Sequence, residues 1–359
     1  MSDLALRAPA APAHPPTLAL TTRLRRQRLI LSALGLLVVG VALAGLGFGQ
    51  VPIPVGEIIA MLFGASPADP THEAVLFAIR LPRVLLGLLV GAGLAVAGAA
   101  FQGLFRNPLA DPGILGVSSG GTLGAVGFIV LGPALGFDFA GIHALPLAAF
   151  VGALGATLLV SRVAVLAGGS TAALLLSGVA IAALASAGTG FLVFLGDDQQ
   201  LRSLVFWTMG SLSAAPMEAI LIALPALLAP VLLLPWLARA LDAMVLGERE
   251  AQHLGLNVTI LKRIVVVVTS FGVGAAVALA GVIGFIGLMA PHLARLALGP
   301  GHRLLLPAAG LIGAALVLAA DLVARLTVAP AELPVGIVTG CMGGPFFLWL
   351  LVRRHARRA

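Results

Sequence analysis

Long apolar segments separated by short polar connections extend over almost the whole chain. The first runs from Leu29 to Gly49, and the others lie at about 84–105, 113–132, 144–167, 172–195, 217–237, 264–298, 304–323 and 333–352. A helix needs about 20 apolar residues to cross the hydrocarbon core of a bilayer. Because the apolar runs are continuous and long, they favour helices over strands. The pattern predicts an all-α polytopic membrane protein whose transmembrane domain occupies residues 29–352.

The segment from Ile264 to Leu298 is too long for one crossing. Its roughly 35 residues would extend about 52 Å as a helix, whereas the hydrocarbon core is about 30 Å thick. Glycine is concentrated in its middle, between Gly281 and Gly287. We expect the chain to divide there, which gives about ten transmembrane helices.

The basic residues predict the orientation of these spans. Of the 21 Lys and Arg residues, all but four fall on the side of the N-terminus when ten spans are assumed. Cytoplasmic loops are enriched in Lys and Arg. We therefore expect both termini to be cytoplasmic, with a basic tail at 353–359. Residues 1–28 are rich in Ala and Pro and are predicted to form a disordered cytoplasmic tail. The apolar run behind them exceeds the core of a secretory signal, which has about 7–15 residues.

Composition narrows the class of protein further. The chain of 359 residues is 60% hydrophobic and 10% charged, with a mean hydropathy of +1.12. Its only lysine, Lys262, is not part of a Gly-Lys-Ser/Thr phosphate loop, so we do not expect the chain to hydrolyse ATP. The single cysteine, Cys341, excludes an intrachain disulfide. We expect membrane lipid as a partner, and no nucleic acid, resident cofactor or metal.

Four arginines break the orientation pattern, because Arg80, Arg83, Arg202 and Arg325 fall on the outer side. Long basic side chains at the ends of spans commonly reach towards lipid headgroups. Arginine also binds carboxylates in a bidentate manner, which would suit an acidic extracytoplasmic partner. The pattern leaves both interpretations open.

Weaker motifs suggest two other classes of protein. Gly116–Gly120 matches the G-x-S-x-G motif of serine hydrolases, and His292 could act as a base in an intramembrane protease. In a chain with 45 glycines such matches are common. Small residues at these spacings more often let helices approach closely, as expected for Gly87 and Gly91.

An ion-coupled carrier and a metal or haem-iron site have less support. A carrier usually has ionisable residues near the middle of the membrane, whereas Glu57, Glu218 and Asp321 fall close to outer ends. The remaining candidates for metal binding are His72, His143 and His292, and no spacing connects any two of them.

The most polar internal segment, 239–263, contains a short helical pattern that ends at Gly255. Its apolar residues Leu246, Ala251 and Leu254 could fill a groove on a cytoplasmic protein. An interfacial loop helix is the alternative.

Several long motifs occur in a fixed order along the chain. They are Arg80–Arg83, Phe105–Gly116, Gly247-Glu248 with His253–Gly255, Gly284–Leu288 with Pro291-His292, and Ala331–Gly336. With these motifs the chain resembles the permeases of the iron-siderophore, haem and vitamin B12 family of bacterial ABC importers. The resemblance covers nearly everything from the first span to the C-terminus.

The resemblance implies a type II importer permease in the bacterial inner membrane. It implies a homodimer around a central pathway, two cytoplasmic ATPase subunits that bind ATP and Mg, and a periplasmic substrate-binding protein. It further implies that Arg80, Arg83 and Arg325 dock the binding protein, and that Asn107 and Thr171 form cytoplasmic gates. The residues of the implied ATPase-coupling helix are Leu246, Gly247, Glu248, Ala251, His253, Leu254 and Gly255.

The segment Asp198–Leu212 is most similar to haem permeases. The resemblance therefore implies haem as the transported ligand, with ferric siderophore and cobalamin as the alternatives.

Overall fold

The computed structural model describes residues 17–67, 69–136 and 141–356, and it contains no β-strand within them. Nine of the described helical segments are long and apolar enough to cross a membrane. They are α1 (Thr17–Gly47), α3 (Pro70–Ala74) continuing through η1 (Val75–Arg80) into α4 (Leu81–Phe105), α5 (Val117–Leu135), α6 (Ala144–Leu166), α7 (Thr171–Leu195), α9 (Met217–Leu233) continuing through η4 (Leu234–Leu237) into α10 (Ala238–Leu246), α12 (Val258–Ala280), α14 (His302–Thr327) and α15 (Val335–Ala356).

The predicted division of 264–298 is confirmed. Helix α12 ends at Ala280, and α13 (Ile286–Leu298) begins after a non-helical segment. Gly281 has φ +67°, a value that favours glycine. At about 1.5 Å per residue, α13 is only about 20 Å long. Together with the non-helical residues 281–285, this shorter apolar helix accounts for the expected tenth crossing.

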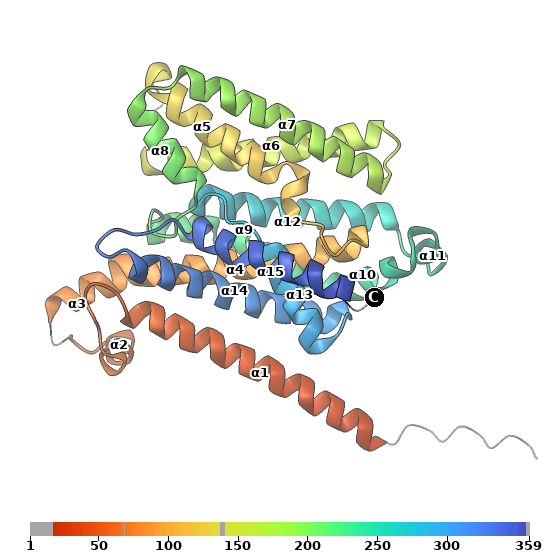
Figure 1. The fold of residues 1–359 in the computed structure, drawn as a ribbon, viewed down its shortest axis with the longest axis horizontal. Helices are drawn as coiled ribbons and strands as arrows, with labels where there is room; N and C mark the ends of the chain where they lie inside the picture. The colour runs from red at the N-terminus through yellow and green to blue at the C-terminus, as the bar shows by residue number, and fades with distance from the viewer. Residues whose placement is uncertain (1–16, 68, 137–140, 357–359) are drawn as a thin grey trace, which may run out of the picture.

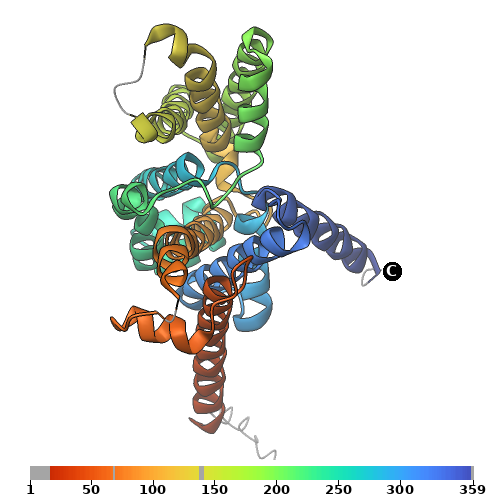
Figure 2. The ribbon, with the colours of Figure 1, turned by 90° about the vertical axis from the view of Figure 1, so that its left-hand side faces the viewer.

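The helices form layers around α4 (Figure 1). Helices α5, α6 and α7 lie together on one side, and α1 lies along the opposite side. Helix α4 is the most enclosed span and packs against α9, α12, α13 and α14. Helix α15 extends away from the body of the molecule (Figure 2). The hydrophobic core therefore sits around α4, while α7 and α15 expose much of their apolar surface.

Short helices mark the two ends of the molecule. The α8 end contains α2 (Val55–Leu62), α3 and α8 (Asp198–Thr208), and the α11 end contains α11 (Glu248–His253) (Figure 1). Helix α1 begins at the α11 end and α15 ends there. Both terminal helices thus reach the same side, as ten crossings require.

Some helix limits differ from those expected. Helix α1 begins at Thr17, so residues 17–28 are helical rather than disordered, and residues 1–16 lie outside the described residues. Helix α15 continues through Arg353 to Ala356, and 357–359 lie outside the described residues. Helix α10 extends the sixth span past Leu237, because η4 continues its helical path.

Glycine allows the closest helix contacts, as predicted for Gly87 and Gly91. A Cβ atom at Gly91 would meet the backbone of Gly313 and Ala314 on α14. Gly120, the last glycine of the G-x-S-x-G match, packs in the same way against Gly152 of α6. Small residues let backbones approach when the lipid supplies no hydrophobic driving force between helices.

We expect Gly91→Ala to destabilise the protein by about 1–3 kcal/mol, because the new methyl group overpacks the contact between α4 and α14. The thermal unfolding midpoint in detergent measures the effect. Gly40→Ala on α1 is the matched control, since no heavy atom lies within 4 Å of its added Cβ. Equal midpoints for the two variants would show that the contact tolerates a side chain.

Candidate functional site

A cavity of about 1080 Å³ opens at the α8 end. Its walls come from the end of α5, the start of α6, helix α8, the end of α12 and residues 332–334. Phe206 and Trp207 contribute aromatic rings. The polar residues in the lining are Asp197, Gln199, Gln200, Ser203, Ser211, Ser213 and Glu332. The lining can therefore contact a flat apolar ligand and also offer hydrogen bonds.

A capping box fixes the start of α8. The Asp197 carboxylate accepts hydrogen bonds from the backbone N–H groups of Gln199 at 2.9 Å and Gln200 at 2.8 Å. In return, Gln200 Oε1 accepts from Asp197 N at 3.1 Å. This reciprocal arrangement satisfies backbone donors that a helix start leaves free. It also sets the rotation of α8 so that Gln199, Ser203 and Phe206, three or four residues apart, face the cavity.

The far end of α8 is joined to α12 and α15 through backbone groups. Ser211 N donates to Ala280 O at 2.8 Å, and Gly336 N donates to Met209 O at 3.0 Å. Val335 N donates to Gly210 O at 3.0 Å. Three elements that are distant in sequence therefore meet at one border of the cavity, and a movement of α15 would be transmitted to α8.

The cavity lining has two charged side chains, both of them carboxylates, and each already has a partner within the chain. Asp197 caps α8, and Glu332 binds Arg83. The lining contains no Lys, Arg or His. A ligand in this cavity would meet apolar, hydroxyl and amide groups and two carboxylates that already have partners, and among the described lining residues it would meet no imidazole able to coordinate a haem iron.

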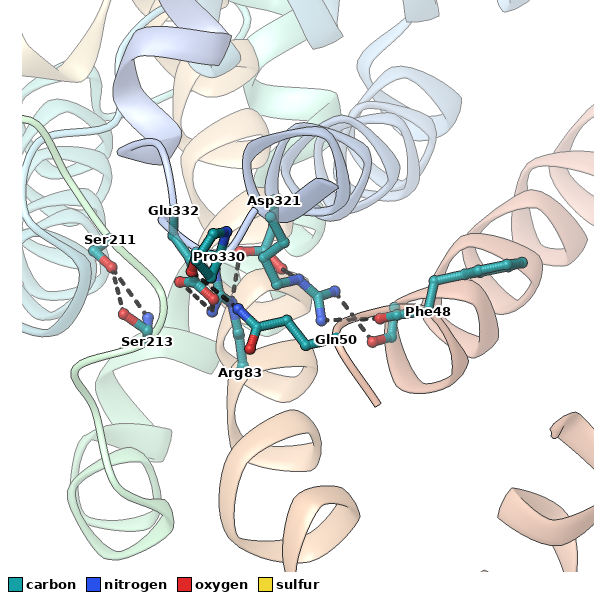
Figure 3. Close-up of polar contacts among 10 residues, drawn as sticks. Phe48, Gln50, Arg83, Ser211, Ser213, Asp321, Pro330 and Glu332 are labelled. Atoms are coloured by element: carbon teal, nitrogen blue, oxygen red, sulfur yellow. Dashed lines mark hydrogen bonds and ion pairs between the residues drawn. The ribbon is translucent and has the colours of Figure 1, made fainter. Parts of the chain in front are cut away.

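A cluster of charged side chains adjoins the cavity through Glu332, which lines it, and Figure 3 shows the contacts of Arg83, Asp321 and Glu332. Arg83 Nε donates to Asp321 Oδ1 at 2.8 Å, and Arg83 Nη1 lies 2.8 Å from Glu332 Oε2. Asp321 Oδ2 lies 3.1 Å from Arg325 Nε, one helical turn further along α14. Asp321 is only 1% exposed, whereas the Glu332 side chain is 40% exposed. Two arginines and two carboxylates thus balance each other where α4 meets α14.

Arg80 and Arg325 also bind the end of α1. Arg80 donates to the carbonyl oxygens of Leu46 at 2.7 Å, Gly47 at 3.0 Å and Val51 at 2.5 Å. Arg325 Nη2 donates to Gly45 O at 3.1 Å. The last carbonyl groups of a helix lack intrahelical partners and carry partial negative charge. The two cations satisfy them and fasten α1 to α4 and α14.

The structure therefore places the three predicted docking arginines together, but inside the chain. Arg80, Arg83 and Arg325 are all buried, and each donates to groups of its own chain. They do not extend into lipid headgroups, so that interpretation is wrong for these three. Their contact with a partner's carboxylates stays a prediction, and such a partner would have to enter the cluster. Arg202, on α8, is exposed.

At the α11 end, one contact joins two of the predicted functional segments. Glu248 Oε1 accepts a hydrogen bond of 2.5 Å from the hydroxyl of Thr171, the first residue of α7. Glu248 Oε2 accepts another of 2.8 Å from Lys262 Nζ on α12. The sequence pattern could not predict that Glu248 contacts Thr171 and Lys262, because the three residues lie on three separate helices.

The environment of Glu248 keeps it ionised. Partial burial favours the neutral acid, but the hydrogen bonds from Lys262 and Thr171 outweigh burial and lower the pKa of Glu248 below its usual value. The charge of Arg106 lowers this pKa further. Arg106 directly precedes the predicted gate residue Asn107, so the loop after α4 also lies within electrostatic reach of α11.

Asn107 itself forms a tight exposed turn. Its side-chain oxygen accepts a hydrogen bond from Leu109 N at 2.9 Å, and Arg106 adopts a left-handed backbone conformation with φ +52°. The turn ends α4 and leads into η2 (Pro112–Leu115). Asn107 and Thr171 thus lie at the same end of the molecule, and their role as gates stays a prediction.

Some of the predicted coupling residues are exposed at the surface of the chain, and others are buried within it. Leu246, His253, Leu254 and Gly255 are exposed around α11, with Leu246 at 66% and Leu254 at 65%. Ala251 is fully buried within the chain, so its predicted contact with a partner is wrong. Gly247, with φ +135°, separates α10 from α11, and Gly255, with φ +84°, follows the end of α11 as expected.

The other sequence candidates lie apart from these sites. His72 pairs with Glu57, His143 lies 3.8 Å from Glu218, and His292 packs edge-on against Phe346. Ser119, within the G-x-S-x-G match, donates to the carbonyl of Gly116 in its own helix turn. Across the described ranges, no three His, Cys, Asp or Glu residues gather as a metal site.

Comparisons with known proteins agree with this architecture. The FecCD transport family model matches residues 36–353. The hemin transport system permease HmuU of Yersinia pestis is 43% identical over 92% of this chain and 98% of its own length. The vitamin B12 import system permease BtuC of Escherichia coli O9:H4 is 44% identical over 82% of this chain and 88% of its own length.

A solved structure shows a similar fold. It is described as an inward-facing conformation of a metal-chelate type ABC transporter, and it aligns with a TM-score of 0.79 and 34% identity over 90% of this chain and 99% of the other. Since the family model covers nearly every span, and relatives above 40% identity extend over most of the chain, this protein belongs to the FecCD transport family of ABC transporter permeases.

Proposed function

We propose that this chain is the membrane subunit of an ATP-driven importer for haem. It acts as a homodimer, with two separate ATPase subunits that bind ATP and Mg and with an extracytoplasmic binding protein that delivers the ligand. The observation that carries the haem proposal is the 43% identity to a hemin permease over 98% of that protein. The aromatic and uncharged surfaces around Phe206 and Trp207 suit a flat, largely apolar ring.

Cobalamin is the second candidate, because the cobalamin permeases of Escherichia coli and Halobacterium salinarum are 44% and 42% identical to this chain. They cover about four fifths of it, compared with 92% for the hemin permease. Ferric siderophore remains the third candidate. All three ligands would use the same machinery.

The α11 end is proposed to face the cytoplasm of the bacterial cell. The positive-inside distribution of arginines supports this orientation. The exposed side chains of Leu246 and Leu254 flank α11 and give a soluble ATPase subunit an apolar contact. Movement of that subunit would reach α7 through Glu248 and Thr171.

Helices α7 and α15 are proposed to meet the second copy of the chain. Large apolar side chains on them are exposed, including Leu176 at 72% and Phe194 at 84% on α7 and Leu348 at 66% on α15. Helix α15 extends away from the core (Figure 2). A second copy packed on this side would enclose a central pathway continuous with the cavity beside α8.

Docking of the binding protein is proposed to involve an exchange of carboxylates at Arg83. Glu332 is the accessible member of the charge cluster, so an acidic side chain of the partner could replace it without uncovering Asp321. Substituting Arg83 and Arg325 would not isolate docking, because it would leave Asp321 buried without a cation, which costs about 3–5 kcal/mol.

We therefore expect Glu332→Gln to bind the binding protein about fivefold more tightly, since removing the competing charge is worth about 1 kcal/mol. Affinity measured by surface plasmon resonance tests this. Glu73→Gln, an exposed charge loss on α3 at the same end, is the control. Equal affinities for the two variants would rule out the exchange.

The coupling contact makes a second prediction. Thr171→Val removes the hydroxyl that binds Glu248, and a hydrogen bond to a charged group contributes about 1.5–3 kcal/mol. We expect uptake per ATP hydrolysed to fall by about tenfold while the ATPase subunit stays bound. Thr171→Ser should retain most of the coupling. If the valine variant transports as efficiently as the serine variant, Thr171 does not transmit the movement.

The ligand itself is tested in proteoliposomes that contain this chain, its ATPase and its binding protein. Haem, a ferric siderophore and cobalamin are offered in parallel, and uptake of haem that requires ATP is expected. Uptake of cobalamin or siderophore without uptake of haem would refute haem as the ligand but not the proposal that the protein is an importer. Uptake that needs no ATP would refute the importer.

A further inference from the structure

A second large hollow lies between α6 and α12 and takes no part in the proposed pathway. It has a volume of about 890 Å³ and follows the α11 half of both helices. Its apolar lining includes Val151, Leu154 and Leu158 on α6 and Val266, Val267 and Phe271 on α12. Helices α6 and α12 lie on the side away from α15 (Figure 2). We refer to this hollow as the α6–α12 groove.

The length of the groove matches one leaflet of a bilayer. From Val151 to Arg162, α6 rises about 16 Å at about 1.5 Å per residue. Half of a hydrocarbon core about 30 Å thick is about 15 Å. An acyl chain that starts at the α11 end would therefore be covered as far as the middle of the membrane.

The groove is basic only at the α11 end, where Arg162, Lys262 and Arg263 line it. Lys262 forms a salt bridge with Glu248. Arg162 and Arg263 are exposed, and neither forms a hydrogen bond or ion pair with another described residue. Ser161, Ser170 and Thr259 add hydroxyl groups at the same level. Two unpaired guanidinium groups and several hydroxyls at the mouth of an apolar channel are complementary to a phosphate attached to a hydrocarbon chain.

We propose that the α6–α12 groove binds an anionic phospholipid of the leaflet at the α11 end. One acyl chain fills the apolar part, and the headgroup phosphate lies between Arg162 and Arg263. The proposed orientation makes this the cytoplasmic leaflet, and no other part of the proposal depends on that orientation.

This position gives the lipid a route to the coupling contact. Gly169 and Ser170 line the groove and immediately precede Thr171, and Lys262 contributes to both the groove and the Glu248 contact. An occupied groove would support the turn between α6 and α7 from the lipid side. The lipid would therefore stabilise the segment through which α11 acts on α7.

Native mass spectrometry of the full-length chain, titrated with phosphatidylglycerol or phosphatidylcholine of identical acyl chains, tests the proposal. Each basic residue near a membrane surface contributes about fivefold to the binding of an anionic lipid. Arg162→Gln with Arg263→Gln should therefore weaken phosphatidylglycerol binding about 25-fold and leave phosphatidylcholine unchanged. The control, Arg239→Gln with Arg303→Gln, removes two exposed arginines outside the groove lining and should have no such effect.

A second pair of variants tests the apolar part without changing charge. Leu158→Trp should fill the groove and abolish retention of phosphatidylglycerol, whereas Leu159→Trp, which is equally lipid-facing but outside the groove, should not. Equal binding of the two lipids, or equal losses in the groove and control variants, would overturn the proposal. These measurements need no ATP, ligand or partner, so their outcome is independent of the transport experiment.

Discussion

The carboxylate of Asp321, buried between Arg83 and Arg325, is the interaction on which the α8 end of this protein depends. Each of its neighbours extends the contact. Arg83 holds Glu332 at the edge of the cavity, and Arg325 reaches the last carbonyl groups of α1. A buried charge that loses its partner costs about 3–5 kcal/mol, so the members of the cluster constrain one another. The cluster therefore fixes three things together: the contact of α4 with α14, the position of α1, and one wall of the cavity.

The sequence was sufficient to predict the spans, because burial in a bilayer imposes a length and a hydropathy on each helix that local composition reveals. The length of 264–298 required a division, the glycines from Gly281 to Gly287 placed it, and the close approach at Gly91 followed from spacing. The charge pattern also showed that the outer arginines were unusual. It could not show that Arg83 binds Asp321 and Glu332 or that Arg325 binds the end of α1, because these contacts join residues 238 to 280 positions apart. Contacts between distant segments also decide which face of a helix is buried, and without them Ala251 was expected at a partner surface. Its position in α11 was predicted, but the face it presents depends on packing.

The two ends of the molecule differ in how they hold their charges. At the α8 end the arginines are inside, and the cavity beside them exposes uncharged side chains with two engaged carboxylates. At the α11 end Glu248 links α11, α7 and α12 at a partly exposed position. A buried cluster resists rearrangement, whereas contacts near the surface are weaker and easier to break. The α8 end is therefore suited to act as a fixed frame, and the α11 end is suited to change its contacts.

The lack of free charges in the cavity at the α8 end affects how a ligand could pass through it without binding too tightly to leave. A lining with free cations would bind an anionic ligand tightly, and a lining with imidazole groups would compete for its metal; either would slow release. The cavity offers instead aromatic rings, Ser and Gln side chains, and backbone groups fixed by the junction of α8, α12 and α15. Such a surface interacts weakly at many points. In the proposed function, transport across it is driven by a change in shape rather than by a gradient of binding strength. Movement at α11 would then have to reach α7 and, through the proposed partner copy and α15, the border of the cavity.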